Sequence, residues 1–340
     1  MKKRITYFDT YRFIAAMMIF LSHYIMAFSR SSFRYFHTLP YSLVLEGVRG
    51  SLGVAMLCVI LGYFAYKKGE KSKESLISLS LKRYAYFVVM AVLYYIIALA
   101  TGWFRVGGGA LNTFLVLAKE SLLLSDTYNG LFWTLVPMLI GSMLCYILGR
   151  SGMKTGGIIV MCCAILMLKD TTVFNCIIGS FVAVWEDDKL VKKIMGRWYV
   201  QLLAVIVTYA LIRTDHESLH LYVLQGVFCI TVLVVTMNSE TLAKVMGAKA
   251  WTYFNRSYFS LYIFHSLLYH NLGRTLLYMD GDMPFKIRFI LVFLLITLIV
   301  VVLSKPLNMV VEFITKRINK LIDKAEARCR KYLSDMYEAA

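Results

Sequence analysis

Long runs of apolar residues recur along the whole chain, and short polar or basic segments separate them. A helix needs roughly 17–25 mostly apolar residues to cross about 30 Å of hydrocarbon. The runs predict ten membrane-spanning helices, at residues 8–28, 48–66, 84–101, 131–149, 155–169, 172–186, 198–213, 219–237, 257–277 and 287–311. The expected fold class is therefore all-α: a polytopic membrane helix bundle.

One further apolar segment, residues 110–125, is shorter than the ten predicted spans. It carries Lys119 and Glu120 within its run. Charged side chains inside the hydrocarbon are costly unless they are paired or reach water. We therefore predict an interfacial or re-entrant helix here rather than an eleventh span.

The composition supports a membrane protein. Hydrophobic residues make up 59% of the chain and charged residues 17%, whereas soluble domains are about 45–50% apolar. The first apolar run follows a basic start, but it is long and no small-residue cleavage site follows it. We expect this run to be the first span rather than a cleaved signal peptide.

The charge distribution predicts an orientation. Ten spans place both termini on one side, and the segments on that side hold 25 of the 37 Lys and Arg residues, against 10 in the opposite loops. Cytoplasmic loops carry the excess of Lys and Arg, so both termini should be cytoplasmic. The net charge of +17 is spread over short loops, which argues against a nucleic-acid-binding surface.

We expect one membrane domain, residues 1–315, and a basic cytoplasmic tail, residues 316–340, that forms an amphipathic helix on anionic lipid. The seven cysteines lie in apolar runs or in the tail, and none has the spacing of metal ligands. They are therefore expected to be core residues or reduced cytoplasmic thiols, and no metal site is predicted.

Ionisable residues within a predicted span are candidates for function. Arg12 and His23 are eleven residues apart, which places them about 20° apart on one helix face, separated by ~16 Å of rise. Asp9 lies one turn before Arg12. Arg12 could grip phosphate, and a neutral His23 could act as a general base. The alternative is that Arg12 reaches the headgroups while His23 bonds a neighbouring helix.

A second group lies near the carboxyl end, where Tyr258, Tyr262, His265 and Tyr269 follow helical spacing. They predict one polar and aromatic face, with His265 near the middle of the bilayer. The alternative is a face that serves packing only.

These motifs resemble, in order, those of the acyltransferase 3 family of integral membrane acyltransferases. Asp9, Arg12 and His23 match its acid, arginine and histidine in the first helix. Later matches are Gly62-Tyr63, the Trp-x-Leu of Trp133 and Leu135, and Ser257, Tyr258 and His265 from a Ser-Tyr-x-x-Tyr-x-x-His helix, with Tyr262 one place off.

The chain also departs from the family pattern. Members often carry Arg-x-x-Arg at the start of the third span for acyl-CoA phosphates, where this chain has Lys82 and Arg83. Pro137 and Met138 occupy the region where many members have a glutamate. Ser304-Lys305-Pro306 stands where many members have Glu-basic-Pro.

The resemblance implies transfer of an acyl group, usually acetyl, from cytoplasmic acyl-CoA to a hydroxyl of a cell-surface glycan or lipid-linked sugar precursor. Acyl-CoA would be a co-substrate, with no permanently bound cofactor. The other partners would be the sugar acceptor and membrane lipid, and the location a cell membrane, expected to be the bacterial cytoplasmic membrane.

The expected residue roles follow from this reaction. Arg12, Lys82 and Arg83 would bind the CoA phosphates. His23 would be the general base or a transient acyl acceptor. His265, with Tyr258 and Tyr262, would line the reaction chamber and orient the thioester, so the expected catalytic residues are His23, Arg12 and His265. Trp133 could stack against sugar or adenine, and Asp9 completes the expected substrate-binding residues with Trp133, Tyr258 and Tyr262.

Two other classes of function remain. A transporter or flippase for a glycan or lipid precursor would use the same ionisable residues as a translocation path, but no inverted repeat is visible. A structural scaffold gives no reason for Arg12 and His23 to align. Dependence on acyl-CoA separates an acyltransferase from both.

Overall fold

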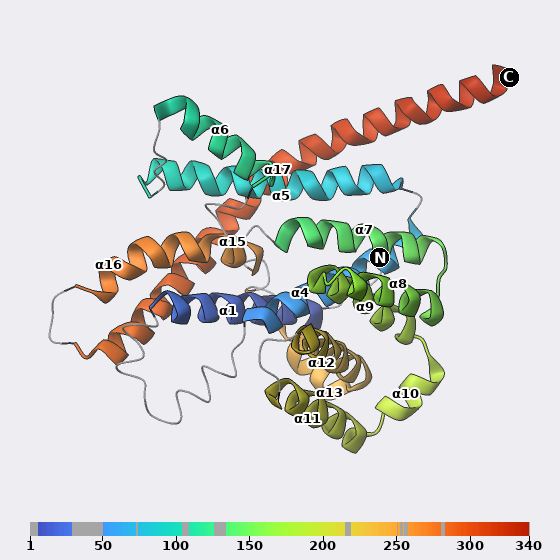
Figure 1. The fold of residues 1–340 in the computed structure, drawn as a ribbon, viewed down its shortest axis with the longest axis horizontal. Helices are drawn as coiled ribbons and strands as arrows, with labels where there is room; N and C mark the ends of the chain where they lie inside the picture. Colours follow the sequence, from blue (N-terminus) through green and yellow to red (C-terminus); the bar gives the residue numbers. More distant parts are fainter. Residues whose placement is uncertain are drawn as a thin grey trace. The chain divides into compact units, whose positions relative to one another are not determined.

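The computed structural model describes residues 6–28, 50–72, 74–103, 109–125, 134–214, 219–249, 251, 254, 258–279 and 283–339. Within these residues the chain consists of helices and short connections, and no strand occurs (Figure 1). The prediction of an all-α fold is therefore confirmed for the described part of the chain.

Each predicted span falls on helical structure in its described part, while residues 48–49, 131–133 and 257 of these spans lie outside the described residues. The helices are α1 (Tyr7–Ala27), α4 (Gly50–Lys71), α5 (Leu76–Ala100), α6 (Gly109–Ser121), α7 (Leu135–Arg150), α8 (Thr155–Met167), α9 (Thr171–Trp185), α10 (Lys189–Met195), α11 (Trp198–Thr214), α12 (Leu219–Asn238), α13 (Glu240–Met246), α15 (Tyr258–Leu268), the π-helical turn η2 (Tyr269–Gly273), α16 (Arg274–Leu277) and α17 (Phe285–Ala339). The predicted span 257–277 comprises three of them, α15, η2 and α16. The last predicted span is the first part of α17, and the tail expected from residue 316 continues the same helix.

Several of these helices have the length and composition of membrane spans. Among the described residues, α1, α4, α5, α12 and α17 are each long and apolar enough to cross a bilayer. The pair α10 and α11, bent by 88°, would add a sixth span if it crosses as one, and α7, α8 and α9 are apolar but shorter. The number of ten spans and the cytoplasmic termini therefore stay predictions.

The chain divides into two compact units, which are described separately. The first contains Met1–Lys71 and Ile140–Lys305, and the second contains Ser72–Leu139 and Pro306–Ala340. The candidate site residues Arg12, His23 and His265 belong to the first unit. Lys82 and Arg83 belong to the second.

Close approach between helices organises the first unit. A Cβ atom at Gly62 of α4 would lie 1.8 Å from the carbonyl oxygen of Cys176 on α9, and one at Gly179 would lie 2.1 Å from the carbonyl oxygen of Val59. Small residues let helix backbones approach closely in membranes, where packing drives association. The two glycines therefore allow α4 and α9 to touch along their backbones.

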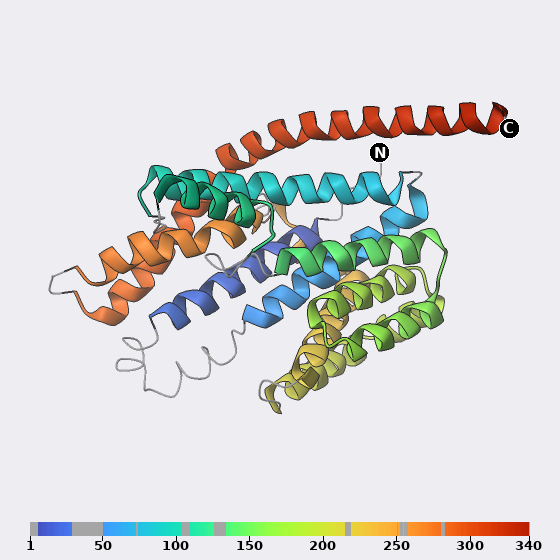
Figure 2. The same ribbon diagram turned by 45° about the horizontal axis from the view of Figure 1, so that its top comes forward.

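Helix α1 runs antiparallel to α4 (Figure 2). The Phe8 ring stacks on Tyr63 at 4.6 Å, near the end of α4. A Cβ atom at Gly50, the first residue of α4, would lie 3.1 Å from the Ser22 side chain. These contacts place the start of α1 beside the end of α4, so the two helices are antiparallel, as consecutive spans should be.

In the second unit, α6 runs back along α5. The Tyr95 hydroxyl donates to the Glu120 carboxylate at 2.8 Å, and the Tyr84 hydroxyl donates to the Leu122 carbonyl at 2.7 Å. The earlier tyrosine of α5 thus contacts the later acceptor, and the later tyrosine contacts the earlier acceptor. The two segments are therefore antiparallel. The prediction that this segment is an interfacial or re-entrant helix stays a prediction.

We expect that Gly62→Ala destabilises the protein, because the added methyl group meets the backbone of α9 and the helices must separate. Overpacking of this kind costs about 1–3 kcal/mol. Thermal unfolding of the detergent-solubilised variant measures the effect. Gly156→Ala on α8 is the matched control, since no atom lies within 4 Å of its added Cβ. Equal melting temperatures for the two variants would contradict the close contact.

A cysteine at Ser72 should not react with a membrane-impermeant thiol reagent in intact cells, because the predicted scheme places the segment 67–83 in the cytoplasm. The background carries Cys163→Ser and Cys329→Ser, which removes the exposed thiols among the described residues. Thr101→Cys, at the exposed far end of α5, should react and serves as the control. Labelling of the Ser72→Cys variant from outside would contradict the orientation.

Candidate active site

Arg12 lies in a cage of one carboxylate and two aromatic rings. Its Nη1 is 3.4 Å from Oδ1 of the buried Asp9. The guanidinium carbon lies 4.7 Å from the ring centre of Phe64 on α4 and 5.6 Å from that of Tyr258 on α15. Aromatic faces attract a guanidinium, so the rings and the carboxylate hold its charge in place. The Arg12 side chain stays 23% exposed, which leaves it accessible to a ligand.

The start of α1 is anchored by hydroxyl groups. The Thr6 hydroxyl donates to the Gly247 carbonyl at 3.0 Å, and the Thr10 hydroxyl donates to the Met246 carbonyl. Both acceptors lie where α13 ends, and a helix leaves its last carbonyl groups without partners inside the helix. These bonds set the rotation of α1 about its axis, and thereby the direction in which Arg12 points.

The structure brings His23 and His265 together. Nδ1 of His23 lies 3.0 Å from Nε2 of His265, and the ring centres are 5.2 Å apart at an interplanar angle of 20°. His265 has no exposed surface, whereas His23 is half-buried. The accessible member of the pair is therefore His23, on the same helix as Arg12.

Aromatic side chains enclose the histidine pair. The Phe20 ring lies 5.3 Å from the His265 ring and stacks on Phe293 of α17 at 4.7 Å. The Tyr24 hydroxyl donates to the Phe289 carbonyl at 3.0 Å. The face of α1 next to His23 is therefore packed against the first part of α17, which restricts the motion of both rings.

Helices α1 and α15 run in the same direction. Arg12 lies beside Tyr258 at the start of α15, and His23 lies beside His265 further along. Two spans with the same direction need an odd number of spans between them, and the ten-span scheme places seven there. The polar lines predicted separately on the two helices therefore face each other.

A π-helical turn follows the buried histidine. Helix α15 ends at Leu268 and η2 continues it, with the buried Tyr269 ring 5.9 Å from the His265 ring. π-helical turns are uncommon and often occur at functional sites. The sequence reasoning missed this turn, since its residues fit an ordinary α-helical spacing.

Tyr262 and Trp133 differ from the other predicted site residues. Tyr262 is 2% exposed and its ring stacks on Phe259 at 6.3 Å, which places it in the packed interior of the first unit. Trp133 lies outside the described residues, as does Ser257.

Lys82 is held by two carboxylates of the second unit. Its Nζ lies 2.6 Å from Oε1 of Glu74 and 2.5 Å from Oδ1 of Asp323 in the tail. Arg83, the next residue, is half-buried. A phosphate would have to compete with these two acids for Lys82. Arg83 is the better candidate of the two for a phosphate because its guanidinium can bond two phosphate oxygens at once.

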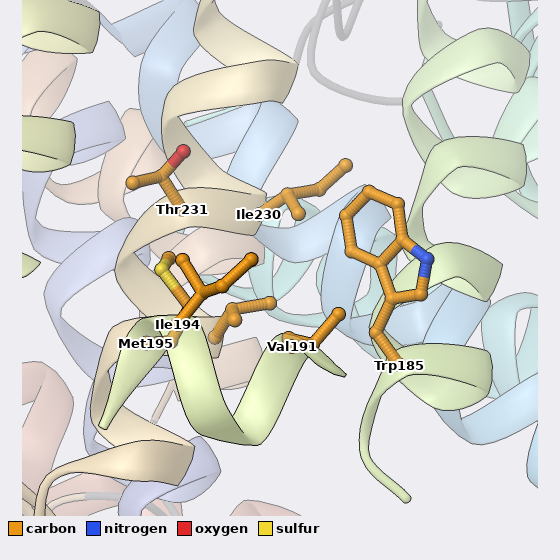
Figure 3. A pocket seen from close by; sticks show the side chains of 7 residues that line it. Trp185, Val191, Ile194, Met195, Ile230 and Thr231 are labelled. Atoms are coloured by element: carbon orange, nitrogen blue, oxygen red, sulfur yellow. The ribbon is translucent and has the colours of Figure 1, made fainter. Parts of the chain in front are cut away.

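A cavity of about 190 Å³ lies in the first unit between α9, α10 and α12 (Figure 3). Its lining is Trp185, Val191, Ile194, Met195, Ile230, Thr231 and Val234. None of these seven side chains titrates near neutral pH, so the cavity offers no group for acid–base chemistry. Within the described part of the chain, no group of three or more His, Cys, Asp or Glu side chains could hold a metal ion.

Comparison with known proteins gives one match. The model of the acyltransferase 3 family, described as an acyltransferase domain, matches residues 5–307. The matched range includes Arg12, both paired histidines and the segment with Lys82 and Arg83. The comparisons with curated proteins and with solved structures found no match.

Proposed function

We propose that the protein transfers an acetyl group from cytoplasmic acyl-CoA to a hydroxyl of a glycan. The chain belongs to the acyltransferase 3 family and is therefore a membrane acyltransferase, which supports this proposal. The acceptor would be a cell-surface glycan or a lipid-linked sugar precursor in a bacterial cytoplasmic membrane. The observation that carries the proposal is the histidine pair, whose accessible member shares α1 with a caged arginine.

The donor has phosphates at one end and the reactive thioester at the other. Arg12 suits the phosphate end because it stays charged and can form bidentate bonds with phosphate oxygens. His23 lies ~16 Å further along α1 by helix rise, which suits the reactive end of a long ligand. In this assignment Asp9 and Tyr258 act by holding the Arg12 guanidinium.

His23 supplies the acid–base chemistry in this proposal. Its imidazole takes the proton of the acceptor hydroxyl while the oxygen attacks the thioester carbonyl carbon. A C–O bond forms, the C–S bond breaks, and the same proton passes from His23 to the departing CoA sulfur. The products are the sugar ester and CoA with a free thiol, so neither an oxidant nor a metal is needed for the balance.

Incorporation of label tests the activity. Membranes that contain the protein are incubated with labelled acetyl-CoA and glycan extracts, and membranes without it serve as the blank. Label should reach the glycan only when both the protein and acyl-CoA are present. A transporter or flippase would move its glycan or lipid precursor without acyl-CoA. Transport of the precursor without acyl-CoA, together with no label on the glycan, would favour that alternative.

His23→Ala should abolish acyl transfer, because general acid–base catalysis contributes about 10²–10⁴-fold to a rate. The protein should remain inserted, since His23 is half-buried and not part of the fully buried core. Thermal unfolding of the variant checks that it is folded, because the substitution also removes the hydrogen-bond partner of the buried His265. Turnover of labelled acetyl-CoA by the purified variant measures the effect. Ser22→Ala, the adjacent half-buried residue, is the control with near-normal turnover. Normal turnover of a folded His23→Ala variant would exclude His23 as the base.

Arg83→Ala should raise the apparent KM for acyl-CoA and change kcat less, because phosphate binding is similar in the ground state and the transition state. Loss of a charge-assisted contact costs about 1.5–3 kcal/mol, or about ten- to hundredfold in affinity. The assignment of Arg83 rests on the family resemblance of its segment. Steady-state kinetics against acyl-CoA measure the change.

Lys68→Ala is the control for general surface charge, since Lys68 is an exposed cation of the same basic segment. If Arg83→Ala and Lys68→Ala have the same small effect, the phosphates are held by other cations of the chain.

A further inference from the structure

The hydrogen bonds of His265 determine which of its ring nitrogens carries a hydrogen. Nδ1 lies 2.8 Å from the carbonyl oxygen of Leu261, one turn earlier on α15. A carbonyl oxygen can only accept, so Nδ1 must be the donor. A neutral imidazole has one N–H, which leaves Nε2 of His265 with a lone pair and no hydrogen.

Burial favours this neutral form. His265 has no exposed surface, and Phe20 and Tyr269 are among the rings around it. A positively charged imidazole would lose its hydration there, and burial therefore disfavours the charged form. Both ring nitrogens of His265 are then engaged within the protein, one as a donor and the other as an acceptor.

The contact with His23 consequently has one direction. Since Nε2 of His265 can only accept, Nδ1 of His23 must carry the hydrogen and donate it across the 3.0 Å contact. The neutral His23 ring then has its lone pair on Nε2. A relay runs from the Leu261 carbonyl through His265 to His23, and it ends at a nitrogen that can accept a proton.

We propose that His265 is a positioning residue, which holds His23 in the tautomer whose Nε2 accepts the proton of the acceptor hydroxyl. The role in turnover rests on the proposed function, whereas the tautomer rests on the hydrogen bonds and the full burial of His265. Full burial of His265 separates it from substrate, so this role differs from the lining of a reaction chamber that the sequence predicted. Leu261 contributes only its backbone carbonyl.

The relay also stabilises the intermediate charge. When Nε2 of His23 takes the hydroxyl proton, the ring becomes a cation and its Nδ1–H becomes a stronger donor to His265. The proton then leaves from Nε2 to the CoA sulfur, and the ring returns to its first tautomer. His265 keeps its own hydrogen on Nδ1 throughout, so it changes neither its charge nor its tautomer.

Two substitutions of His265 separate the relay from simple packing. His265→Gln keeps an acceptor oxygen at about the distance of Nε2, whereas His265→Leu fills similar space without an acceptor. Ser266→Ala is the matched control, because Ser266 is the next buried residue on α15 and its hydroxyl oxygen has no hydrogen-bond partner. If His265→Leu does not fold, His265→Asn replaces it, since its shorter side chain cannot reach His23.

The first measurement is nitrogen NMR of ¹⁵N-histidine-labelled protein in lipid nanodiscs, with the His23 signals assigned by their loss in His23→Ala. We expect the hydrogen of neutral His23 on Nδ1 in the unsubstituted protein, in His265→Gln and in Ser266→Ala. His265→Leu should shift the population toward the Nε2–H form. Observation of Nε2–H in the unsubstituted protein, or an unchanged tautomer in His265→Leu, would overturn the proposal.

The second measurement is kcat for acyl transfer. We expect kcat of His265→Leu to fall by about 10²-fold or more, in line with the usual contribution of a positioned base. His265→Gln should recover most of the rate, and KM for acyl-CoA should stay nearly constant across the series. Equal losses in His265→Gln and His265→Leu would indicate packing alone and reject the positioning role.

The two measurements also distinguish the two proposals. The expected tautomer series without acyl transfer by the unsubstituted protein would reject the proposed function and leave the relay in place. Acyl transfer with the wrong His23 tautomer would reject the relay and leave the function in place.

Discussion

A polar side chain inside a bilayer cannot turn to water, so it must find its partner within the protein. The first unit meets this constraint at several polar positions in and just before α1. Threonine hydroxyls use the free carbonyl groups at the end of α13, Arg12 uses Asp9 and two rings, and His23 uses His265. The same contacts that satisfy the polar groups also fix the rotation and direction of α1 against α15. Stability and the arrangement of the candidate site therefore depend on the same bonds.

Much of the helical structure is visible in the sequence because helix formation depends on local pattern. The apolar runs predicted helical segments that the structure contains, and the eleven-residue spacing placed Arg12 and His23 on one face. Contacts between residues far apart in the chain could not be predicted in this way, since the spacing along one helix does not show which helix packs against it. The His23–His265 contact joins residues 242 positions apart, and the Lys82–Asp323 pair joins residues 241 positions apart. Neither pairing follows from periodicity.

The direction of the hydrogen bonds was also beyond the sequence. His265 was recognisable as an ionisable residue in an apolar segment, and the family resemblance marked it as part of a site. Only the position of Nδ1 against the Leu261 carbonyl shows which nitrogen has the lone pair. The π-helical turn after His265 and the two acids around Lys82 add local detail of the same kind. These features depend on side-chain orientation, which tertiary packing decides.

The distance in sequence between the two histidines has a consequence for biosynthesis. Ribosomes add about 5–20 residues per second, so His265, 242 positions after His23, is added about ten to fifty seconds later. During that time α1 is in the membrane without the helix that orients its histidine. A nascent chain thus carries Arg12 and His23 before His265 is available to hold the His23 ring. The contact between the two histidines can form only after α15 has been synthesised, so the geometry of the candidate site is completed late in biosynthesis.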